Sequence, residues 1–410
     1  MLTAGAFGVD TKSTNGYQLF SLLFVLFTVA FAGGLLIRLR VRVERILPQY
    51  FTVGETAGYR ISLVNEGQKP VTDLALIDEL KETMPTREEL EHFHDLQAKP
   101  RLRRIISFRM WLRYLHHRRG GFIQEHPIDE LKPGTSMTLE QSFVPTRRGI
   151  IFFQGMSVAR SDTLGVYRRL FYFRHEQRCL VLPKRYPVAP IDLPGKRKYQ
   201  SGGVALAGSV GDSSEFISLR DYRKGDPLNS VHWKSFARHG KLIVREYQDE
   251  FFVRRGLVLD TFTDGIGNEL FEAAVSVAAS VCLEERSNDS LLDLMFVGLD
   301  TYCFTTGRGV DHMPHMQEVL ASIAPAPDAG FDRLHRAVEN HLPHCSSMVC
   351  VLLQWDQSRR DMVRMLEMNS APALVMLLHD GSVTRETLPE PPQRLRLVDY
   401  HHVQRDLAAA

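Results

Sequence analysis

The sequence has 410 residues, of which 44% are hydrophobic and 24% are charged, and its formal net charge is +2. This composition is that of a folded protein and excludes a disordered or fibrous chain. The near-neutral total argues neither for nor against nucleic acid. Because the sequence contains no recognisable nucleic-acid-binding module, we expect no nucleic-acid partner.

The first predicted element is an apolar helix over residues 16–37, a stretch without any charged residue. Its length is about the 20 residues that a helix needs to cross the hydrocarbon core of a membrane. Four arginines follow it directly, and they are Arg38, Arg40, Arg42 and Arg45. By the positive-inside rule, we expect a single-pass protein of the cell membrane with the bulk of the chain in the cytoplasm.

A cleaved signal peptide is the alternative for this apolar segment. Ala30-Phe31-Ala32 resembles the small-x-small pattern of a cleavage site. The leader before it is not basic, however, and arginines crowd directly behind the site. We therefore favour an anchor that stays on the chain.

Short alternating segments predict an all-β, immunoglobulin-like sandwich over residues 41–185. Tyr59, Ile61 and Leu63 alternate with polar residues before the turn at Asn65-Glu66-Gly67, and a similar pattern follows Lys132-Pro133-Gly134. Alternation of this kind is typical of strands with one buried face, and several such strands at this spacing indicate a sandwich.

A basic helical insertion of about residues 86–121 interrupts these strands. Its second half holds seven arginines, and no acidic residue occurs from residue 98 to 124. As a helix it places Ile105, Phe108 and Trp111 on one face. Packing of this helix on the sandwich and contact with lipid or a protein partner both stay open.

The five cysteines are odd in number and lie in apolar runs. They are Cys179, Cys282, Cys303, Cys345 and Cys350. Thiols in such surroundings are typically buried and reduced, which suits a cytosolic location.

Residues 218–250 are the most unusual stretch of the chain, because charged, aromatic and glycine residues alternate throughout it. Gly225-Asp226-Pro227 predicts a turn, and Gly240 with the β-branched residues after it predicts a turn that leads into a strand. One interpretation is a salt-bridged structural plug around a buried Trp233 that acts as a packing anchor. The other is a docking surface or oxyanion-binding patch built on Arg220, Lys234, Arg238 and Arg245.

This stretch resembles the signature of the domain-of-unknown-function-58 family, membrane-associated proteins of bacteria and archaea. The matching residues are Arg220, Asp221, Tyr222, Gly225, Asp226, Trp233, Lys234, Arg238, Lys241, Arg245, Glu246 and Glu250. The chain departs from the family at residues 229–232, where arginines and an Ile-Asp pair are usual. The resemblance implies partnership with a MoxR-type AAA+ ATPase and other membrane-complex proteins, in the assembly or remodelling of another complex.

Strands and helices alternate through the rest of residues 190–410, which predicts an α/β sheet with helices on both faces. The order of elements, with Asp260 closing the first strand, is similar to the von Willebrand factor A domain. That domain binds a metal ion through D-x-S-x-S and later loop residues, and Asp260 with Asp264 stands at the equivalent position. Mg²⁺ prefers such oxygens, and Asp356 is a further candidate. The alternative is a degenerate site in which Asp260 caps a helix or meets an arginine.

Two classes of function follow. The first is a membrane-anchored interaction or scaffold protein that is not an enzyme and presents surfaces to other proteins. The second is a metal-dependent hydrolase that uses the carboxylates at the end of the first α/β strand. We favour the first, because the sequence supplies no nucleophile with its base and no nucleotide-binding motif.

Overall fold

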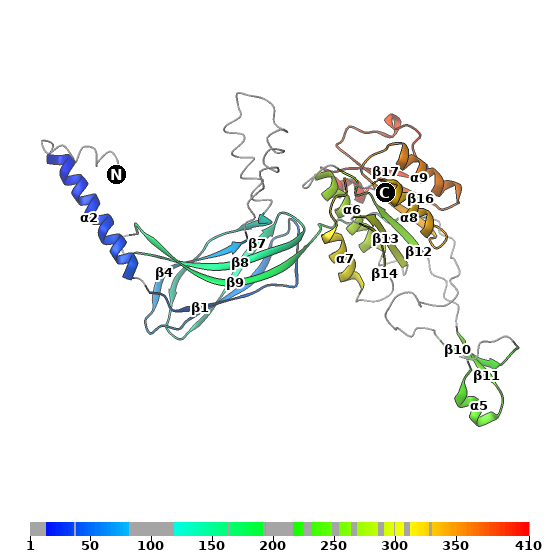
Figure 1. Cartoon of the computed structure of the whole chain (residues 1–410), viewed down its shortest axis with the longest axis horizontal. Coiled ribbons are helices and arrows are strands. Elements are labelled where there is room, and N and C mark those ends of the chain that lie inside the picture. Colours follow the sequence, from blue (N-terminus) through cyan, green and yellow to red (C-terminus); the bar gives the residue numbers. More distant parts are fainter. Residues whose placement is uncertain are drawn as a thin grey trace. The chain divides into compact units, whose positions relative to one another are not determined.

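The computed structural model divides the chain into two compact units, Met1–Lys184 and Arg185–Ala410 (Figure 1). It describes residues 14–36, 38–81, 119–162, 165–191, 193, 216–224, 231–247, 254–263, 269–285, 291–298, 300–306, 312–327 and 330–409. Most of the predicted insertion lies outside these residues, and so do Gly225, Asp226, Glu250 and Asp264.

The first helix of the described chain is α2 (Thr14–Leu36), which covers nearly all of the predicted apolar helix. Its outward side chains are large and apolar, and those most exposed to solvent are Leu19, Leu22, Phe24, Val25, Phe27, Val29 and Phe31. The transmembrane span predicted over residues 16–37 finds no support in the described part of the chain, where no helix has both the length and the apolar character to cross a membrane.

Two packed sheets follow α2, which confirms the predicted β-sandwich. One sheet has the order β1-β3-β7-β5 and the other β2-β9-β8-β4-β6. Apolar side chains alternate inward along the strands, as in β3, where Tyr59, Ile61 and Leu63 are buried. The strands are β1 (Val41–Ile46), β2 (Tyr50–Thr52), β3 (Ala57–Asn65), β4 (Val71–Leu80), β5 (Gly121–Ile123), β6 (His126–Leu131), β7 (Ser136–Pro145), β8 (Gly149–Ser161) and β9 (Arg168–Leu182).

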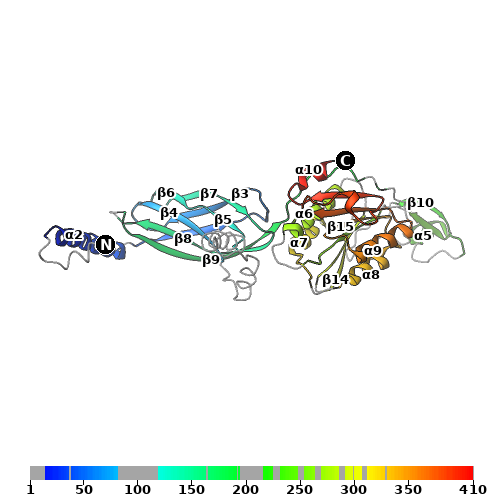
Figure 2. The same ribbon diagram turned by 90° about the horizontal axis from the view of Figure 1, so that it is seen from above.

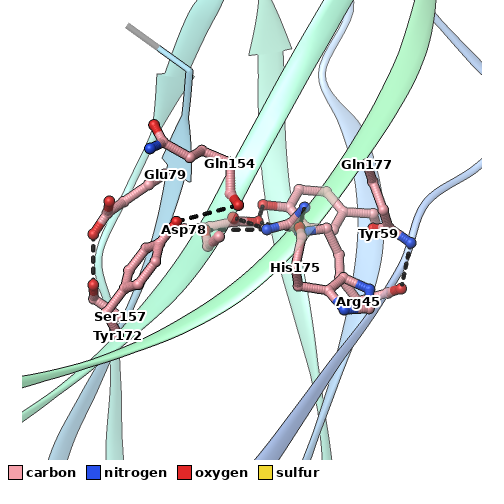
Figure 3. Close-up of polar contacts among 10 residues, drawn as sticks. Arg45, Tyr59, Asp78, Glu79, Gln154, Ser157, Tyr172, His175 and Gln177 are labelled. Atoms are coloured by element: carbon pink, nitrogen blue, oxygen red, sulfur yellow. Dashed lines mark hydrogen bonds and ion pairs between the residues drawn. The ribbon is translucent and has the colours of Figure 1, made fainter.

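A buried arginine joins the two sheets of this sandwich (Figure 3). Arg45 of β1 donates hydrogen bonds to both carboxylate oxygens of Asp78 of β4, at 2.6 and 3.0 Å, and to the carbonyl oxygen of Gly155 at 3.1 Å. Tyr59 of β3 donates its hydroxyl to the same carboxylate at 2.5 Å. Arg45 was predicted among the arginines beside the apolar helix, but its side chain is fully buried in this core.

The second unit contains a six-stranded sheet with the order β14-β13-β12-β15-β16-β17. All neighbouring pairs are parallel except β13 and β14, so the predicted α/β sheet is confirmed. The strands are β12 (Arg254–Leu259), β13 (Leu291–Val297), β14 (Thr301–Thr306), β15 (Ser347–Leu352), β16 (Ala373–His379) and β17 (Leu395–Asp399).

Helices cover both faces of this sheet, as predicted (Figure 2). One face packs on α6 (Glu269–Glu285), α7 (His312–Ser322) and α10 (Val403–Ala408). The other packs on α8 (Asp332–His341) and α9 (Gln357–Met368). Neighbouring residues of one strand therefore enter different cores, as Leu257 and Val258 of β12 do. A single-turn 3₁₀ helix, Arg385–Thr387, precedes β17. The carboxyl-terminal residues are less peripheral than predicted, because Val403 and Leu407 of α10 are buried.

The family-like stretch forms a small element of its own, which we call the signature module. It consists of β10 (Phe216–Asp221), β11 (Ile243–Tyr247) and α5 (Trp233–His239). The two strands pair antiparallel, and Val231 bridges to Val244 of β11. Gly240 ends α5 in the left-handed region, at φ 63°, where glycine is favoured, so the predicted turn into a strand is confirmed.

The five cysteines, all of them within the described ranges, form no disulfide, and four of them are buried, as expected. Burial raises the pKa of Cys179 to about 11 and that of Cys350 to about 12. The pKa of Cys345 is also raised to about 12, by burial and by the neighbouring Asp293. Such thiols stay protonated at neutral pH and are poor nucleophiles.

Candidate functional site

The natural place for a ligand in the α/β sheet is the carboxyl edge between β12 and β15. After β12 the chain adds β13 on one side, and it later returns to place β15 on the other side of β12. In parallel sheets, ligands bind in the crevice at such a change of direction. Asp260, which follows β12, and Asp356, which follows β15, both lie at this edge.

Asp260 is fully buried, and both of its carboxylate oxygens are occupied by protein donors. Oδ1 accepts from the backbone N–H of Phe262 at 3.1 Å and from Nη2 of Arg359 at 3.1 Å. Oδ2 accepts from the backbone N–H of Leu353 at 3.2 Å and from Nε of Arg359 at 2.7 Å. Four donors thus fill the lone-pair directions of this carboxylate.

Arg359 supplies the positive charge at this edge. It lies in the first turn of α9, and its side chain is almost completely buried. Its Nη1 donates to Asp356, which also accepts the backbone N–H of Arg359 at 3.0 Å and so caps the amino end of α9. Burial alone would lower the pKa of Arg359, but the bonds and charges of Asp260 and Asp356 raise it. The guanidinium therefore stays charged.

This arrangement does not suit a metal ion. Mg²⁺ needs open oxygen ligands at short distance, whereas the guanidinium of Arg359 and two backbone N–H groups already bind Asp260. The contact of Asp260 with an arginine is the alternative that the sequence left open. Across the described ranges, no group of three or more His, Cys, Asp or Glu side chains is placed to hold a metal ion. Asp264 lies outside these ranges, so the paired-carboxylate site stays a prediction.

The signature module presents aromatic side chains to solvent, which corrects the prediction of a buried Trp233. Trp233 is 58% exposed and Phe236 is 38% exposed. Their rings meet edge to face at a centroid distance of 6.1 Å, and we call this pair the aromatic patch. The structural plug around a buried tryptophan is therefore wrong. A two-stranded hairpin with one short helix has no second layer in which to bury so large a ring.

The other predicted residues that the structure describes lie on the strands of the module, on α5 and in the turns beside them. Lys234, Arg238 and Lys241 are exposed, and in the described part of the chain none of them forms an ion pair. Arg220 donates to the carbonyl oxygen of Asp221 at 3.2 Å. The backbone N–H of Tyr222 bonds to the carbonyl oxygen of Leu242, which closes the hairpin. Arg245 and Glu246 are placed by their backbone on β11.

Sequence reasoning missed Arg359, although α9 carries a usable signal. Arg359, Met362, Val363 and Leu366 are the buried residues of this helix and follow the i, i+3, i+4, i+7 spacing of an apolar face. An arginine on such a face has to be buried and therefore needs an acidic partner. Which acid it meets does not follow from the sequence, because Asp260 lies 99 residues away.

The chain therefore combines a β-sandwich with an α/β sheet whose usual ligand edge is filled by an internal ion pair, and it carries a separate aromatic and basic module. Residues 218–390 match the family model described as "Protein of unknown function DUF58". The predicted family is thus confirmed for this part of the chain, which contains the described signature residues and the Asp260–Arg359 pair.

Comparison with other proteins adds one relative and distant structural neighbours. "Uncharacterized protein YeaD" of Bacillus subtilis (strain 168) is 26% identical over 190 residues, which are 45% of this chain and 46% of that protein. The chain thus matches less than half the length of this relative.

Among solved structures, the CARDB domain of a Pyrococcus furiosus protein is 14% identical over 34% of this chain and 93% of that chain, with a TM-score of 0.20. Trypsin-activated alpha-2-macroglobulin from Escherichia coli is 12% identical over 38% of this chain and 9% of that chain, with a TM-score of 0.20. Scores this low support no argument about this chain.

Proposed function

We propose that this chain is a membrane-attached interaction protein that recruits a partner protein through its signature module. The observation that carries the proposal is the aromatic patch, in which Trp233 is more than half exposed. Exposed tryptophan is costly in water, and tryptophan is among the residues that contribute most to protein interfaces. A surface of this kind serves contact with another protein better than chemistry on a small molecule.

The charges around the patch indicate what the partner surface is like. Lys234 and Arg238 lie on the same short helix as Trp233 and Phe236, and Lys241 follows it. Exposed cations around an apolar centre are typical of the polar rim of an interface. The matching partner surface has an apolar pocket for Trp233 and an acidic rim, because opposite charges guide two proteins together.

The partner that we propose is a MoxR-type AAA+ ATPase, together with other proteins of the same membrane complex. This choice rests on the family resemblance of the signature residues. The chain would act as a scaffold that brings the ATPase to a complex that is assembled or remodelled at the membrane.

Attachment to the membrane is assigned to α2. Its exposed face of leucine, valine and phenylalanine is of a kind that soluble surfaces avoid. The end of α2 is held against the sandwich, where the rings of Phe31 and Tyr167 lie 6.1 Å apart and Arg169 donates to the carbonyl oxygen of Gly34 at 3.1 Å. Gly34 makes this contact possible, because a Cβ there would lie 2.3 Å from the Tyr167 ring.

The side of the membrane follows from charge. Arg38, Arg40 and Arg42 come directly after α2, while Arg45 is excluded from this count by its burial. Basic residues beside an apolar helix favour the cytoplasmic side and its anionic lipids. We therefore place the folded units at the cytoplasmic face of the cell membrane.

Binding of the purified chain to the MoxR-type ATPase of the same organism tests the partner. Trp233→Ala is expected to weaken binding by roughly 30-fold or more, the effect of losing a central interface tryptophan. Arg238→Glu is also expected to weaken binding. The loss of affinity should be larger at low salt than at high salt, because salt screens the charges. Met368→Ala and Arg336→Glu, which change exposed residues of the α/β sheet's helices, are the matched controls. Binding that is unchanged by both module variants would remove this surface from consideration.

Flotation with vesicles of phosphatidylethanolamine and phosphatidylglycerol tests the attachment. The unchanged chain should float with the vesicles, and a variant with Leu22→Asp and Phe24→Asp should stay behind. Met368→Asp, which introduces a charge at an exposed apolar residue of α9, is the control. Protease treatment of right-side-out and inverted membrane vesicles then reports the side on which the two units lie. The proposal fails if the α2 variant floats as well as the unchanged chain.

The metal-dependent hydrolase has no observation in its favour. Its first ligand would be Asp260, whose oxygens are bound by Arg359 and by backbone N–H groups. An isolated carboxylate at this edge would also need a base to activate water.

A further inference from the structure

The first unit leaves one side of its longest strand without a neighbouring strand. β9 pairs with β8 along most of its length, and Figure 2 shows it along the border of the sandwich. On its other side β9 pairs with β2, but only from Leu180 to Leu182. In the part of the chain that the structure describes, no strand pairs with residues 168–176 on this side. We call residues 168–176 the open edge.

The backbone of the open edge directs hydrogen-bonding groups away from β8. At the end of the β8–β9 hairpin, the N–H of Asp162 donates to the carbonyl oxygen of Tyr167 at 2.9 Å. In an antiparallel ladder, bonded and non-bonded residue pairs alternate. The register with β8 therefore places Leu170, Tyr172 and Arg174 in non-bonded pairs, whose N–H and C=O groups point away from β8. Such a row of groups is a template for a further strand.

The side chains of the same residues lie on the outer face of the sheet. Leu170 is 59% exposed. Tyr172 is 49% exposed, although its hydroxyl donates to the carbonyl oxygen of Gln154 at 3.3 Å (Figure 3). The charged members of this exposed row are Arg168, Arg174 and Glu176. Charges usually protect an edge strand from pairing with another strand, so their order along the row decides whether pairing is favourable.

This order of charges is complementary to itself in one register. Two antiparallel copies of β9 centred on Tyr172 place Arg168 of each copy opposite Glu176 of the other. The neighbouring registers that use the same backbone groups are centred one residue earlier or later. They place Arg168 opposite Arg174 or opposite Arg178, and like charges directly opposite each other are destabilising. The charges thus favour the register centred on Tyr172.

The contacts that these charges make within one chain are weak. Arg168 pairs with Glu125, and both side chains are less than half exposed, at 45% and 44%. Arg174 pairs with Glu176 at 2.7 Å, and these side chains are 77% and 62% exposed. Ion pairs in contact with solvent contribute little to stability, so they can exchange partners at low cost.

The neighbouring elements approach β9 from the interior of the sandwich. α2 contacts the start of β9 through the side chains of Tyr167 and Arg169, which alternate with the exposed row. Arg45 of β1 donates to the carbonyl oxygen of His175 at 3.3 Å. None of these contacts uses the backbone groups that point away from β8.

We propose that two copies of this chain dimerise through the open edge. Their β9 strands pair antiparallel about a two-fold axis at Tyr172, and this joins one sheet of each sandwich into a continuous sheet. Tyr172 lies opposite Tyr172 and diagonal to Leu170 of the other copy, where aromatic and long side chains interact. The two pairs of Arg168 with Glu176 fix the register. The interface uses neither the signature module nor the α/β sheet.

Oxidative crosslinking of Tyr172→Cys in the full chain tests the centre of this interface. Opposite residues of a bonded antiparallel pair have Cα atoms about 5.5 Å apart, a distance that a disulfide spans. Copper phenanthroline should therefore produce a covalent dimer on a non-reducing gel. Tyr50→Cys is the control, because Tyr50 is also 49% exposed but pairs with Leu180, far from the axis. No dimer from position 172, or equal dimer from both positions, would overturn the proposal.

Exchange of the two charges tests the register. Arg168→Glu and Glu176→Arg should each weaken the dimer by about tenfold, because two repulsive contacts replace two attractive ones. The double variant should dimerise like the unchanged chain, since its charges match again. Glu140→Arg, at an exposed position of β7, should have no effect.

Analytical ultracentrifugation of the purified full chain measures the dimer, and circular dichroism shows that each variant is folded. Single variants that dimerise as well as the unchanged chain would overturn the proposal, and so would a double variant that stays as weak as the single ones. None of these outcomes depends on the binding of an ATPase or a membrane.

Discussion

Among the described residues, Arg45 of the first unit and Arg359 of the second are buried arginines that a carboxylate holds, and the two differ in where they lie. Arg45 crosses the middle of the sandwich and binds Asp78 of the opposite sheet, with Tyr59 on the same carboxylate. Arg359 lies at the carboxyl edge of a parallel sheet and binds Asp260. The chemistry is nearly the same in both. The position of each pair in the fold indicates its role.

No ligand is expected inside the core of a small sandwich, so the Arg45 pair joins the two sheets and has no further role to explain. At the carboxyl edge between β12 and β15, by contrast, a bound ion or cofactor would be usual. There Arg359 occupies the position of a ligand. This difference is why the proposed function rests on the signature module and not on Asp260 at the carboxyl edge of the α/β sheet.

Loss of either arginine should have the largest effect on stability. Arg359→Met and Arg45→Met each leave a buried carboxylate without its partner, which costs about 3–5 kcal/mol. Urea unfolding, followed by circular dichroism, measures the loss. Replacement of the whole pair by Asp260→Leu with Arg359→Met should recover only part of it, because the uncompensated charge is gone but the backbone N–H groups of Phe262 and Leu353 lose the acceptor that Asp260 supplies.

Metal ions sharpen the same comparison. Added Mg²⁺ should not change the urea concentration at which the unchanged chain unfolds, because Arg359 already binds the carboxylate of Asp260. A clear stabilisation by Mg²⁺, lost in Asp260→Asn, would instead show that the carboxyl edge is a metal site and that its likeness to the Arg45 pair is superficial.

Tyr59 gives the sandwich pair a dependence on alkaline pH. Burial and the nearby Asp78 raise the pKa of Tyr59 above its ordinary value of 10. The phenol therefore keeps its proton in the folded state while the unfolded chain loses it above pH 10, and stability falls by about 1.4 kcal/mol per pH unit. Tyr59→Phe should cost about 1.5–3 kcal/mol at pH 7. The difference in free energy of unfolding between the unchanged chain and Tyr59→Phe, measured by urea unfolding, should decrease as pH rises beyond 10. A difference that stays constant with pH would contradict this account.

Asp356 should contribute less than either buried partner. Its side chain is 45% exposed, so its pairing with Arg359 is weakened by solvent. Asp356→Ala mainly removes the cap of α9, which costs about 1 kcal/mol. The unfolding temperatures of Asp356→Ala and Asp260→Ala show which of the two carboxylates contributes more to stability. Equal losses would mean that the exposed carboxylate, and not Asp260, holds Arg359 in place.

The cysteines should show the smallest effect. With pKa values of about 12, Cys345 and Cys350 should not react with iodoacetamide at pH 8 while the chain is folded. Mass spectrometry should find them modified only after unfolding in urea. Modification of Cys345 in the folded chain would show that the core of the α/β unit opens more readily than its packing indicates.

The regular parts of the fold could be predicted from the sequence because their patterns are local. Alternation along β3 and the helical spacing of α9 each follow from neighbouring residues. The Asp260–Arg359 pair could not be predicted, since it joins residues far apart and depends on which helix returns to which strand end.

Trp233 shows a different reason for failure. A tryptophan among charged residues normally indicates a packing anchor, and its size favours burial. Burial also needs a second layer of structure, and the described part of the signature module has two strands and one short helix. The sequence indicated the correct elements around Gly240, but it could not show that they leave this ring in solvent.

Photo-crosslinking in native membranes tests the central claim, that the aromatic patch is where a partner protein binds. A p-benzoylphenylalanine residue would replace Trp233 in one variant and Met368, which is 79% exposed on α9, in the other. We predict that position 233 crosslinks to one defined protein, the MoxR-type ATPase or a neighbour in its complex, and that position 368 does not. Equal labelling from both positions, or no protein product from position 233, would contradict the account.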